Sequence, residues 1–424
     1  MRTPLYKSRP VGPHSARFGG ERINDFIVMS EGNSNTYLLE TPAGNILINS
    51  GMGYEAPVHA ANFQALGNGA AIKYLITTQG HVDHVGGVQY FRDQHPGLQY
   101  IAQANNPEHQ EYDARLQAFR GQRSAFRFME AFKQDFAYYA EQGYTGINAQ
   151  DTPTADILFE ERHELSLGGL DLVLIAAAGA ETNDSLIVWL PQHRIVLTGN
   201  LFGCPFGHFP NLVTIRGDRY RDALTCAAAA DSVLELNAEM LLYGHHEPVV
   251  GGTLIRSEIS TYRDAIHYVH DEVVKGMNAG EPLHQLQQDI QLPAELEVGQ
   301  GYGKVSWSIR AIWENYAGWF KHESTTELYS VPPTAVYADL LELAGAGPLL
   351  DKAREKLAAG LLEESLHLLD ILLSVQADNT EAKELAVAVH QALLESADNF
   401  WLNGWLENQI KLLQGGSTAP LAFK

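Results

Sequence analysis

The stretch YLITTQGHVDHVGG, residues 74–87, constrains the fold more than any other part of the chain. It begins as an apolar, β-branched segment, which predicts a buried strand, and it ends in paired glycines that let the backbone turn tightly into a helix. Between strand and glycines lie His81, Asp83 and His84. Imidazole and carboxylate groups crowded at a rigid strand end suit zinc, iron or manganese, so we expect a divalent metal site. A polar turn whose histidines cap a helix or face solvent is the alternative.

Strand signals fall into two groups, one within residues 25–104 and one within 155–244. Each group is closed by helix-compatible segments, at 218–236 and 253–277 for the second group, and the long polar-aromatic stretch 107–143 reads as a helical insertion. Strands in two batches with helices outside predict two sheets packed face to face. The expected fold class is therefore α/β (α+β), followed by an all-α region.

Strand signals almost disappear after residue 280, and Leu and Ala recur at helical spacing instead. The segment from Gly360 to Ala386 resembles one helical-repeat hairpin, with Asp378 or Asn379 capping its second helix. A single hairpin of this kind cannot bury its apolar face alone. We therefore expect a strand-containing domain over 1–280, a helical connection over 281–324, and a helical dimerisation or docking domain over 325–424.

The composition indicates which classes of binding partner and which cellular compartment to expect. The net charge of −22 over 424 residues argues against nucleic acid and anionic membrane surfaces, which both favour basic patches. The two cysteines, Cys204 and Cys226, are too few for a disulfide framework and lack zinc-finger spacing, which favours reduced structural thiols. With neither a signal-peptide core near the N-terminus nor an unbroken apolar span, the sequence predicts a cytoplasmic protein without a membrane partner.

The motif TTQGHVDHVGG resembles the metallo-β-lactamase superfamily signature, in which His-x-His-x-Asp-His follows a strand. GAETNDSLIVWLPQHRIVLTGN, FPNLVTIRGDRYRDAL and YGHHEPVVGG resemble further segments of alkyl sulfatases, and the C-terminal helices resemble their dimerisation domain. The likeness extends over most of the chain from about residue 30. It implies an αββα metallo-β-lactamase sandwich followed by an all-α helical domain, and a homodimer.

The resemblance also implies two metal positions joined by a bridging residue. One ion would be held by Gln79, His81 and Glu181, and the other by Asp83, His84 and His245, with Asn200 as the bridge. The sequence departs from the family at Gln79, where the family has His, and at Asn200, where it has an acid. Asn49 likewise replaces an acid that is usual in the superfamily. An amide oxygen can ligate a metal, but it is neutral and weak beside imidazole or carboxylate.

These replacements fall unevenly on the two positions. Asp83, His84 and His245 form a complete set of two histidines and a carboxylate, which suits catalytic zinc and equally a non-haem iron. The other set has lost one imidazole and the anionic bridge that offsets repulsion between neighbouring cations. We expect one or two zinc ions, with iron or manganese as alternatives, and a weaker second position.

Arg216 and Asn211 match residues that hold the sulfate group in alkyl sulfatases. The planar guanidinium fork of Arg suits an oxyanion, although Arg216 could equally pair with an acid such as Asp218. His208 and His246 lie near the site segments and could donate protons, but a supporting structural role is favoured for each.

The implied activity is hydrolysis of an ester in a small anionic substrate, with a metal-bound hydroxide as the nucleophile. Asp83, Asn200 and Arg216 are the expected catalytic residues, and a sulfate ester with an apolar alkyl or aryl tail is the first substrate. Two alternatives stay open. One is another reaction on the same scaffold: lactone, thioester or phosphoester hydrolysis, or iron-dependent oxidation. The other is a non-catalytic binding protein with an impaired metal centre.

Overall fold

The computed structural model describes residues 4–9, 11–12, 14–144, 148–203 and 206–416, so Cys204 lies outside the described residues. The chain divides into two compact units. The first is Met1–Gln117 with Gln134–Tyr316, and the second is Ala118–Lys133 with Ala317–Lys424. The domain limits at 280 and 324 remain a prediction.

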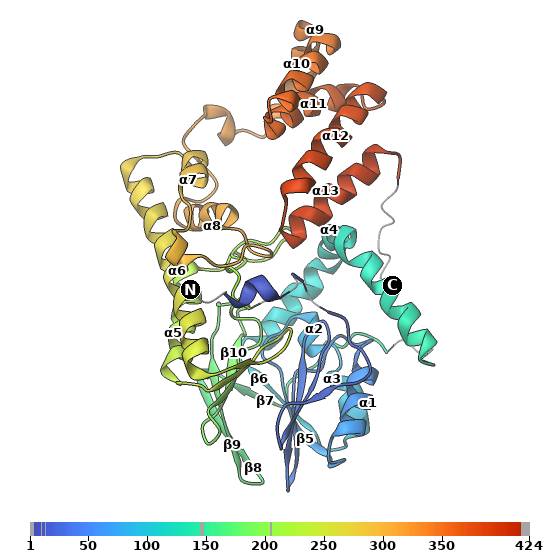
Figure 1. Ribbon diagram of the computed structural model, residues 1–424, viewed down its shortest axis with the longest axis vertical. Coiled ribbons are helices and arrows are strands. Elements are labelled where there is room, and N and C mark those ends of the chain that lie inside the picture. Colours follow the sequence, from blue (N-terminus) through green and yellow to red (C-terminus); the bar gives the residue numbers. More distant parts are fainter. Residues whose placement is uncertain (1–3, 10, 13, 145–147, 204–205, 417–424) are drawn as a thin grey trace. The chain divides into compact units, whose positions relative to one another are not determined.

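The first unit contains a sheet in the order β1-β2-β3-β4-β5-β6-β7 (Figure 1). Its strands are β1 (Glu21–Arg22), β2 (Ile27–Ser30), β3 (Thr36–Thr41), β4 (Gly44–Ile48), β5 (Ile72–Ile76), β6 (Gln99–Gln103) and β7 (Ile157–Phe159). Neighbours are antiparallel from β1 to β4 and parallel from β4 to β7. The parallel part places the strand of the histidine motif, β5, between two neighbours.

A second sheet has the order β13-β12-β11-β10-β9-β8. Its strands are β8 (Arg162–Leu167), β9 (Leu170–Ala176), β10 (Leu186–Leu190), β11 (Ile195–Leu197), β12 (Met240–Leu242) and β13 (Val249–Val250). Strands β11 and β12 are parallel, whereas the other neighbours are antiparallel. The parallel pair brings the segments that follow β11 and β12 to the same edge.

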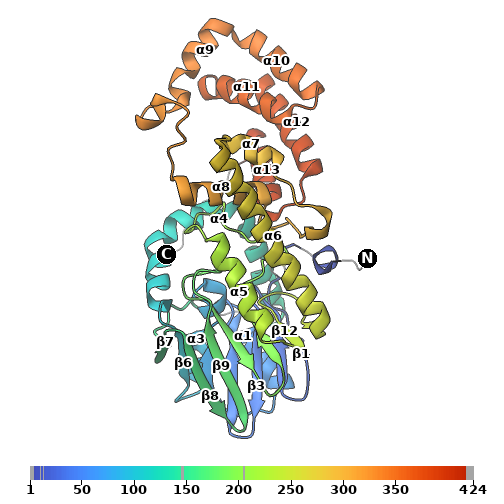
Figure 2. The same cartoon turned by 90° about the vertical axis from the view of Figure 1, so that its left-hand side faces the viewer.

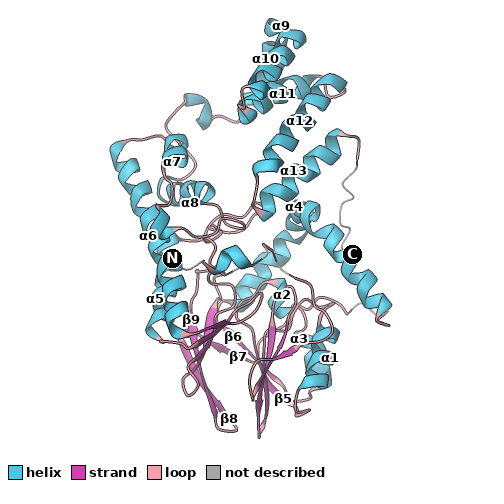
Figure 3. Cartoon of the chain, viewed as in Figure 1, coloured by secondary structure: helices cyan, strands magenta, loops and turns pink. Residues whose placement is uncertain are grey.

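The two sheets face each other with helices on their outer sides (Figures 1 and 3). Alternate residues of one strand point to opposite faces: Ile46 and Ile48 of β4 join the core between the sheets, while Leu47 joins the core under α1 (Ala56–Leu66) and α3 (Val88–Gln94). In β11, Ile195 and Leu197 face the first sheet. The expected αββα sandwich is therefore confirmed.

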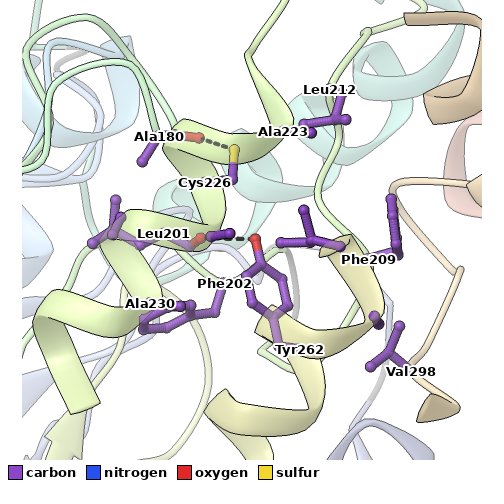
Figure 4. Packing of buried hydrophobic residues seen from close by; sticks show 14 of the residues in the cluster. Ala180, Leu201, Phe202, Phe209, Leu212, Ala223, Cys226, Ala230, Tyr262 and Val298 are labelled. Atoms are coloured by element: carbon purple, nitrogen blue, oxygen red, sulfur yellow. Dashed lines mark hydrogen bonds between the residues drawn. The ribbon is translucent and has the colours of Figure 1, made fainter. Parts of the chain in front are cut away.

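The outer face of the second sheet is covered by α5 (Ala223–Glu235) and α6 (Gly252–Ala279), which cross in front of it in Figure 2. Helices α7 (Leu283–Asp289) and α8 (Val305–Ala317) continue this layer. Two side chains tie the layer to the loops beneath it (Figure 4). Cys226 Sγ donates to the carbonyl of Ala180 at 3.1 Å, and Tyr262 Oη donates to the carbonyl of Leu201 at 3.1 Å. These carbonyls immediately precede Glu181 and follow Asn200, respectively.

The second unit is helical, as expected. It holds α9 (Tyr337–Ala344), α10 (Ala346–Ala358), α11 (Leu362–Val375), α12 (Thr380–Ser396) and α13 (Phe400–Leu413), together with the middle of α4 (Asn106–Glu141). Asn379, and not Asp378, caps α12 by accepting from Ala382 N. The fully buried Trp401 packs edge-on against Phe126 and Phe128 of α4. Those aromatic side chains of α4 thus serve as core.

Several elements differ from the sequence expectation, among them α1, β1 and β13, which were not expected. The helix expected from 218 begins at Ala223, because the Asp222 carboxylate caps it by accepting from Thr225 N. Strand β8 was not expected, because its side chains are largely polar and half-exposed. Among the described helices, none has the length and apolar character needed to cross a bilayer.

Candidate metal centre

The candidate ligands gather where strands of both sheets end. Strand β5 ends at Ile76, and the chain passes through residues 77–81 into the one-turn helix α2 (Val82–Val85), which carries Asp83 and His84. Asn200 follows β11 and His245 follows β12. Since β11 and β12 are parallel, these two side chains leave the sheet at one edge. The fold therefore brings together residues that are up to 166 positions apart in sequence.

We call Asp83, His84 and His245 the intact half of the centre. His84 Nε2 lies 3.5 Å from Asp83 Oδ2 and 3.2 Å from Asn200 Nδ2. His84 is fully buried, and His245 is 3% exposed. The ligand atoms of the three do not all lie within 4.8 Å of one another, since among the described residues only a different group meets that limit.

The ring of His84 is oriented by hydrogen bonds on its other nitrogen. Nδ1 lies 3.1 Å from Ser34 Oγ and 3.2 Å from Thr78 Oγ1, so Nε2 faces Asn200. Thr78 is in turn held by Asn49, whose Oδ1 accepts from Thr78 N at 2.9 Å and from Thr78 Oγ1 at 3.1 Å. Asn49, which replaces an acid of the superfamily, thus supports the ligand loop, and it does so from a left-handed backbone with φ 61°.

Burial keeps the imidazoles of the intact half neutral. It lowers the pKa of His84 to about 3 and that of His245 to about 3. Burial also raises the pKa of the Asp83 carboxyl above its ordinary value, an effect that His245 opposes. A neutral imidazole offers a free lone pair at neutral pH, which is the form that binds a metal.

Gln79, His81 and Glu181 form what we call the substituted half. His81 Nδ1 lies 2.8 Å from Gln79 Nε2 and 4.0 Å from Glu181 Oε1, so the three side chains do converge. Gln79 Oε1 also accepts from Asn200 N at 3.4 Å, which joins this half to Asn200. Burial lowers the pKa of His81 well below its ordinary value.

Cationic side chains already occupy the surroundings of the substituted half. Arg221, which is 6% exposed, places NH2 2.9 Å from Glu181 Oε1 and donates from NH1 to the carbonyl of Asn211 at 2.7 Å. Arg216 NH2 lies 3.4 Å from His81 Nε2. The charge of Glu181 is therefore balanced by a guanidinium, and a second cation beside it would meet two positive neighbours.

The proposed oxyanion-binding residues lie in the same segment. Arg216 NH2 is 3.9 Å from Asp218 Oδ2, so the pairing that we considered from the sequence is present but long. Asp218 Oδ2 also lies 3.7 Å from His81 Nε2. Burial would lower the pKa of Arg216, but Tyr302 and Asp218 outweigh it and raise that pKa. Asn211 is buried, and its carbonyl accepts from Arg221 NH1.

The polar atoms of the centre fit a cation at the intact half. Asn200 Oδ1 and His245 Nδ1 are buried, and neither has a hydrogen-bond partner. Buried acceptors of this kind normally find a donor or an ion. Gly244 makes room for Asn200, because a Cβ at position 244 would lie 1.9 Å from Asn200 Oδ1. Two neutral imidazoles, a carboxylate and an amide oxygen form a donor set suited to zinc, manganese or iron.

Sequence reasoning missed two supporting residues. The buried Asp184 accepts from Gly80 N at 3.0 Å and from Asn106 Nδ2 at 2.7 Å, and so fixes the loop before His81. The only feature of the sequence that pointed to Asp184 was its position three residues after Glu181. Arg221 could be noticed only as the second arginine after Arg216, since its partner Glu181 is 40 positions away.

His208, considered as a proton donor, is engaged in a loop. Its Nδ1 accepts from Gly301 N at 2.9 Å, and its backbone bridges to Gly299. Burial lowers the pKa of His208 to about 4. The rings of His246 and His245 have centroids 6.5 Å apart.

Comparison with known proteins agrees with this architecture. Residues 29–245 match the model of the metallo-β-lactamase superfamily, and residues 283–415 match the model described as alkyl sulfatase dimerisation. A linear primary-alkylsulfatase of Pseudomonas sp. (strain ATCC 19151) is 24% identical over 88% of this chain and 73% of its own length. An alkyl/aryl-sulfatase of Saccharomyces cerevisiae is 25% identical over 81% of this chain, which spans 55% of that relative.

A third relative, an (R)-specific secondary-alkylsulfatase of Pseudomonas sp., is 27% identical over 65% of this chain and 42% of its own length. Among solved structures, the stereoselective inverting sec-alkylsulfatase of Pseudomonas sp. superimposes with a TM-score of 0.81 at 21% identity, over 95% of this chain and 66% of that one. At this identity the likeness shows the fold. Because the superfamily model spans just over half of its residues, this chain belongs to the metallo-β-lactamase superfamily and carries an alkyl sulfatase-type dimerisation region after that domain.

Proposed function

We propose that this protein is a metal-dependent hydrolase that cleaves sulfate esters carrying an apolar alkyl or aryl group. The named relatives are alkylsulfatases, and the chain covers between 42% and 73% of their lengths. The observation that carries the proposal is the environment of His84. Its Nε2 meets Asp83 and Asn200 in a fully buried position where the imidazole is neutral, while Arg216 lies within the same site.

The residues divide the work between holding the ion and holding the substrate. Asp83, His84 and His245 would bind the metal, with Asn200 as an additional oxygen donor. A metal bound there would acidify water and stabilise developing negative charge. Arg216 supplies a permanent positive charge with a planar fork that suits the oxygens of a sulfate group. Asn211, whose carbonyl is fixed by Arg221, adds an amide near the same position.

The direct test is sulfate release from an alkyl sulfate such as dodecyl sulfate, measured by ion chromatography on zinc-loaded protein. We expect the parent to release sulfate. The Asp83→Asn variant should release it at least about a hundredfold more slowly, because the carboxylate is part of the proposed ligand set. The matched control is Glu407→Gln, which neutralises an exposed carboxylate on α13 and leaves release unchanged. Parent protein that carries metal but frees no sulfate would refute the proposal.

Metal analysis distinguishes hydrolysis from oxidation on the same scaffold. We propose zinc as the resident ion because imidazole and carboxylate donors without thiolate suit it. Protein purified without chelator should contain zinc or manganese by plasma mass spectrometry. Iron as the major ion would favour the oxidative alternative, and absence of metal at His84 would favour a binding role.

We also propose that the helical region 325–424 mediates a homodimer. The described part of this region exposes large apolar side chains, including Leu343 at 85% and Tyr329 at 69%. Such exposure is costly unless a partner covers it. Light scattering on the full chain should give twice the mass of 46.7 kDa. A clean monomer at micromolar concentration contradicts this proposal without affecting the proposed activity.

A further inference from the structure

Three residues from separate segments meet outside the candidate metal centre. His14 precedes β1, Glu31 directly follows β2, and His246 lies in the loop between β12 and β13. One ligand atom of each lies within 4.8 Å of the other two, and no other group of three His, Cys, Asp or Glu residues in the described part of the chain meets this limit. His14 Nδ1 is 3.0 Å from Glu31 Oε1, and the rings of His14 and His246 meet edge-on with centroids 4.6 Å apart.

We propose that His14, Glu31 and His246 form a second divalent-cation site, of the zinc type, separate from the catalytic centre. Two imidazoles and one carboxylate are a common zinc donor set, with water completing a tetrahedron. Ligand atoms around zinc at bond lengths of about 2.0–2.1 Å lie about 3.3 Å apart. The three side chains therefore need only a small contraction to enclose an ion.

His246 provides the second observation that points to a ligand. Its side chain is 2% exposed, yet its Nε2 has no hydrogen-bond partner, although a buried imidazole nitrogen normally has one. Its backbone has φ 62°, a conformation that is uncommon for a residue with a side chain. Asn35 Nδ2 donates to the carbonyl of His246 at 2.7 Å and so maintains that conformation.

The charges around the cluster are compatible with a cation. Glu31 contributes a carboxylate, and its hydrogen bond raises the pKa of His14. Glu247 adds a second carboxylate, while Arg9 directs its guanidinium to Glu247, with Nε 3.1 Å from Oε1 and NH2 2.9 Å from the carbonyl oxygen. Binding of zinc would displace the proton shared by His14 and Glu31 into solvent. Zinc binding therefore replaces the weak, exposed ion pair between His14 and Glu31 with three metal–ligand bonds.

One residue of the cluster is adjacent in sequence to a candidate ligand of the catalytic centre, but the proposed ion is a separate one. His246 follows His245, and their ring centroids are 6.5 Å apart. An ion bound by His246 would tie the segment around His14 to the loop that carries His245. The expected role is to fix this loop, since no substrate-binding residue that we identified belongs to the cluster.

The test counts zinc on the full chain after dialysis against submicromolar free zinc, using native mass spectrometry. We expect His14→Ala and Glu31→Gln each to lose one ion per chain relative to the parent. The side chains of His14 and Glu31 are 45% and 42% exposed, so neither variant should disturb folding. The matched control is His367→Ala, which removes an exposed imidazole on α11 and should keep the parent count.

A calorimetric titration separates this site from the centre. In a His84→Ala background, which weakens the catalytic set, zinc should still bind with one site per chain, and His14→Ala should weaken that binding more than tenfold. Equal zinc counts and equal affinities for the parent, His14→Ala and His367→Ala would overturn the proposal. So would the absence of any zinc binding in the His84→Ala protein if that variant retains the parent's circular dichroism spectrum.

Discussion

The two halves of the candidate metal centre differ in the charged groups that lie beside their half-buried carboxylates. In the intact half, the Asp83 carboxylate lies 3.5 Å from His84 Nε2, and burial raises its pKa against the opposing effects of His245 and Arg216. In the substituted half, Arg221 contacts Glu181 at 2.9 Å. The carboxylate near Gln79 is therefore already in contact with an internal cation. The comparison suggests that a protein cation can stand in for a metal when ligand strength falls.

The largest expected effect is loss of the ion from the intact half. In protein carrying His14→Ala, so that the further site contributes nothing, His84→Ala or His245→Ala should lower bound metal from about one per chain to near zero, because each removes an imidazole ligand. Gln79→Ala should change the count little. Plasma mass spectrometry of the purified variants measures this. If all three variants lose nearly all of their bound metal, the two halves contribute equally to metal binding, and the distinction between them is wrong.

The next effect is on stability. Arg221→Met leaves Glu181 buried without its partner, so the free energy of unfolding in the presence of chelator should fall by about 3–5 kcal/mol. Zinc should restore part of that loss, because the freed carboxylate can then bind a cation. Urea denaturation with and without zinc measures both quantities.

The double variant Glu181→Gln/Arg221→Met is the control for this ion pair. It removes both charges, so it should lose less stability than Arg221→Met and gain nothing from zinc. If Arg221→Met is equally stable with chelator and with zinc, Arg221 does not substitute for an ion.

A repaired centre should show a smaller change in metal count. Gln79→His with Asn200→Asp restores an imidazole and an anionic bridge, and bound metal at the centre should rise from near one to near two per chain. Sulfate release from dodecyl sulfate is measured alongside. We expect the native activity to fall as metal rises, because an added bridge would hold the attacking water between two ions. A repaired protein that still binds one metal would show that Gln79 and Asn200 are not ligand positions.

The smallest effect concerns pH. Because burial lowers the pKa of His84 and His245 to about 3, both rings stay neutral as pH falls from 7 to 5.5, and no proton competes with the ion. Zinc affinity of the intact half should then change by less than about tenfold over this range. Two imidazoles with the ordinary pKa of about 6.5 would lose about a hundredfold. A competition titration with a chromophoric chelator distinguishes these outcomes, and the steeper loss would contradict the assigned environment.

Elements with a strong local pattern could be predicted from the sequence. The strand β5, the glycine turn after α2 and the long helix α4 follow from apolar runs, paired glycines and continuous helix-compatible residues. Strand β8 was missed because its side chains are largely polar. The start of α5 was placed too early because the polar residues from 218 are compatible with a helix. In the fold, they form the loop that holds Arg216, Asp218 and Arg221 around the centre.

The sequence by itself determined which ligand types are present and where they are replaced, because His81, Asp83 and His84 lie within one short motif and Gln79 and Asn200 stand at recognisable positions. Only the tertiary structure decided how the charges are matched. Arg221 meets Glu181 across 40 positions, and Arg216 meets His81 across 135. The bond from Cys226 of α5 to the Ala180 carbonyl anchors the segment that carries Glu181. Electrostatic energy depends on distance and burial in space, and neither can be read from spacing along the chain.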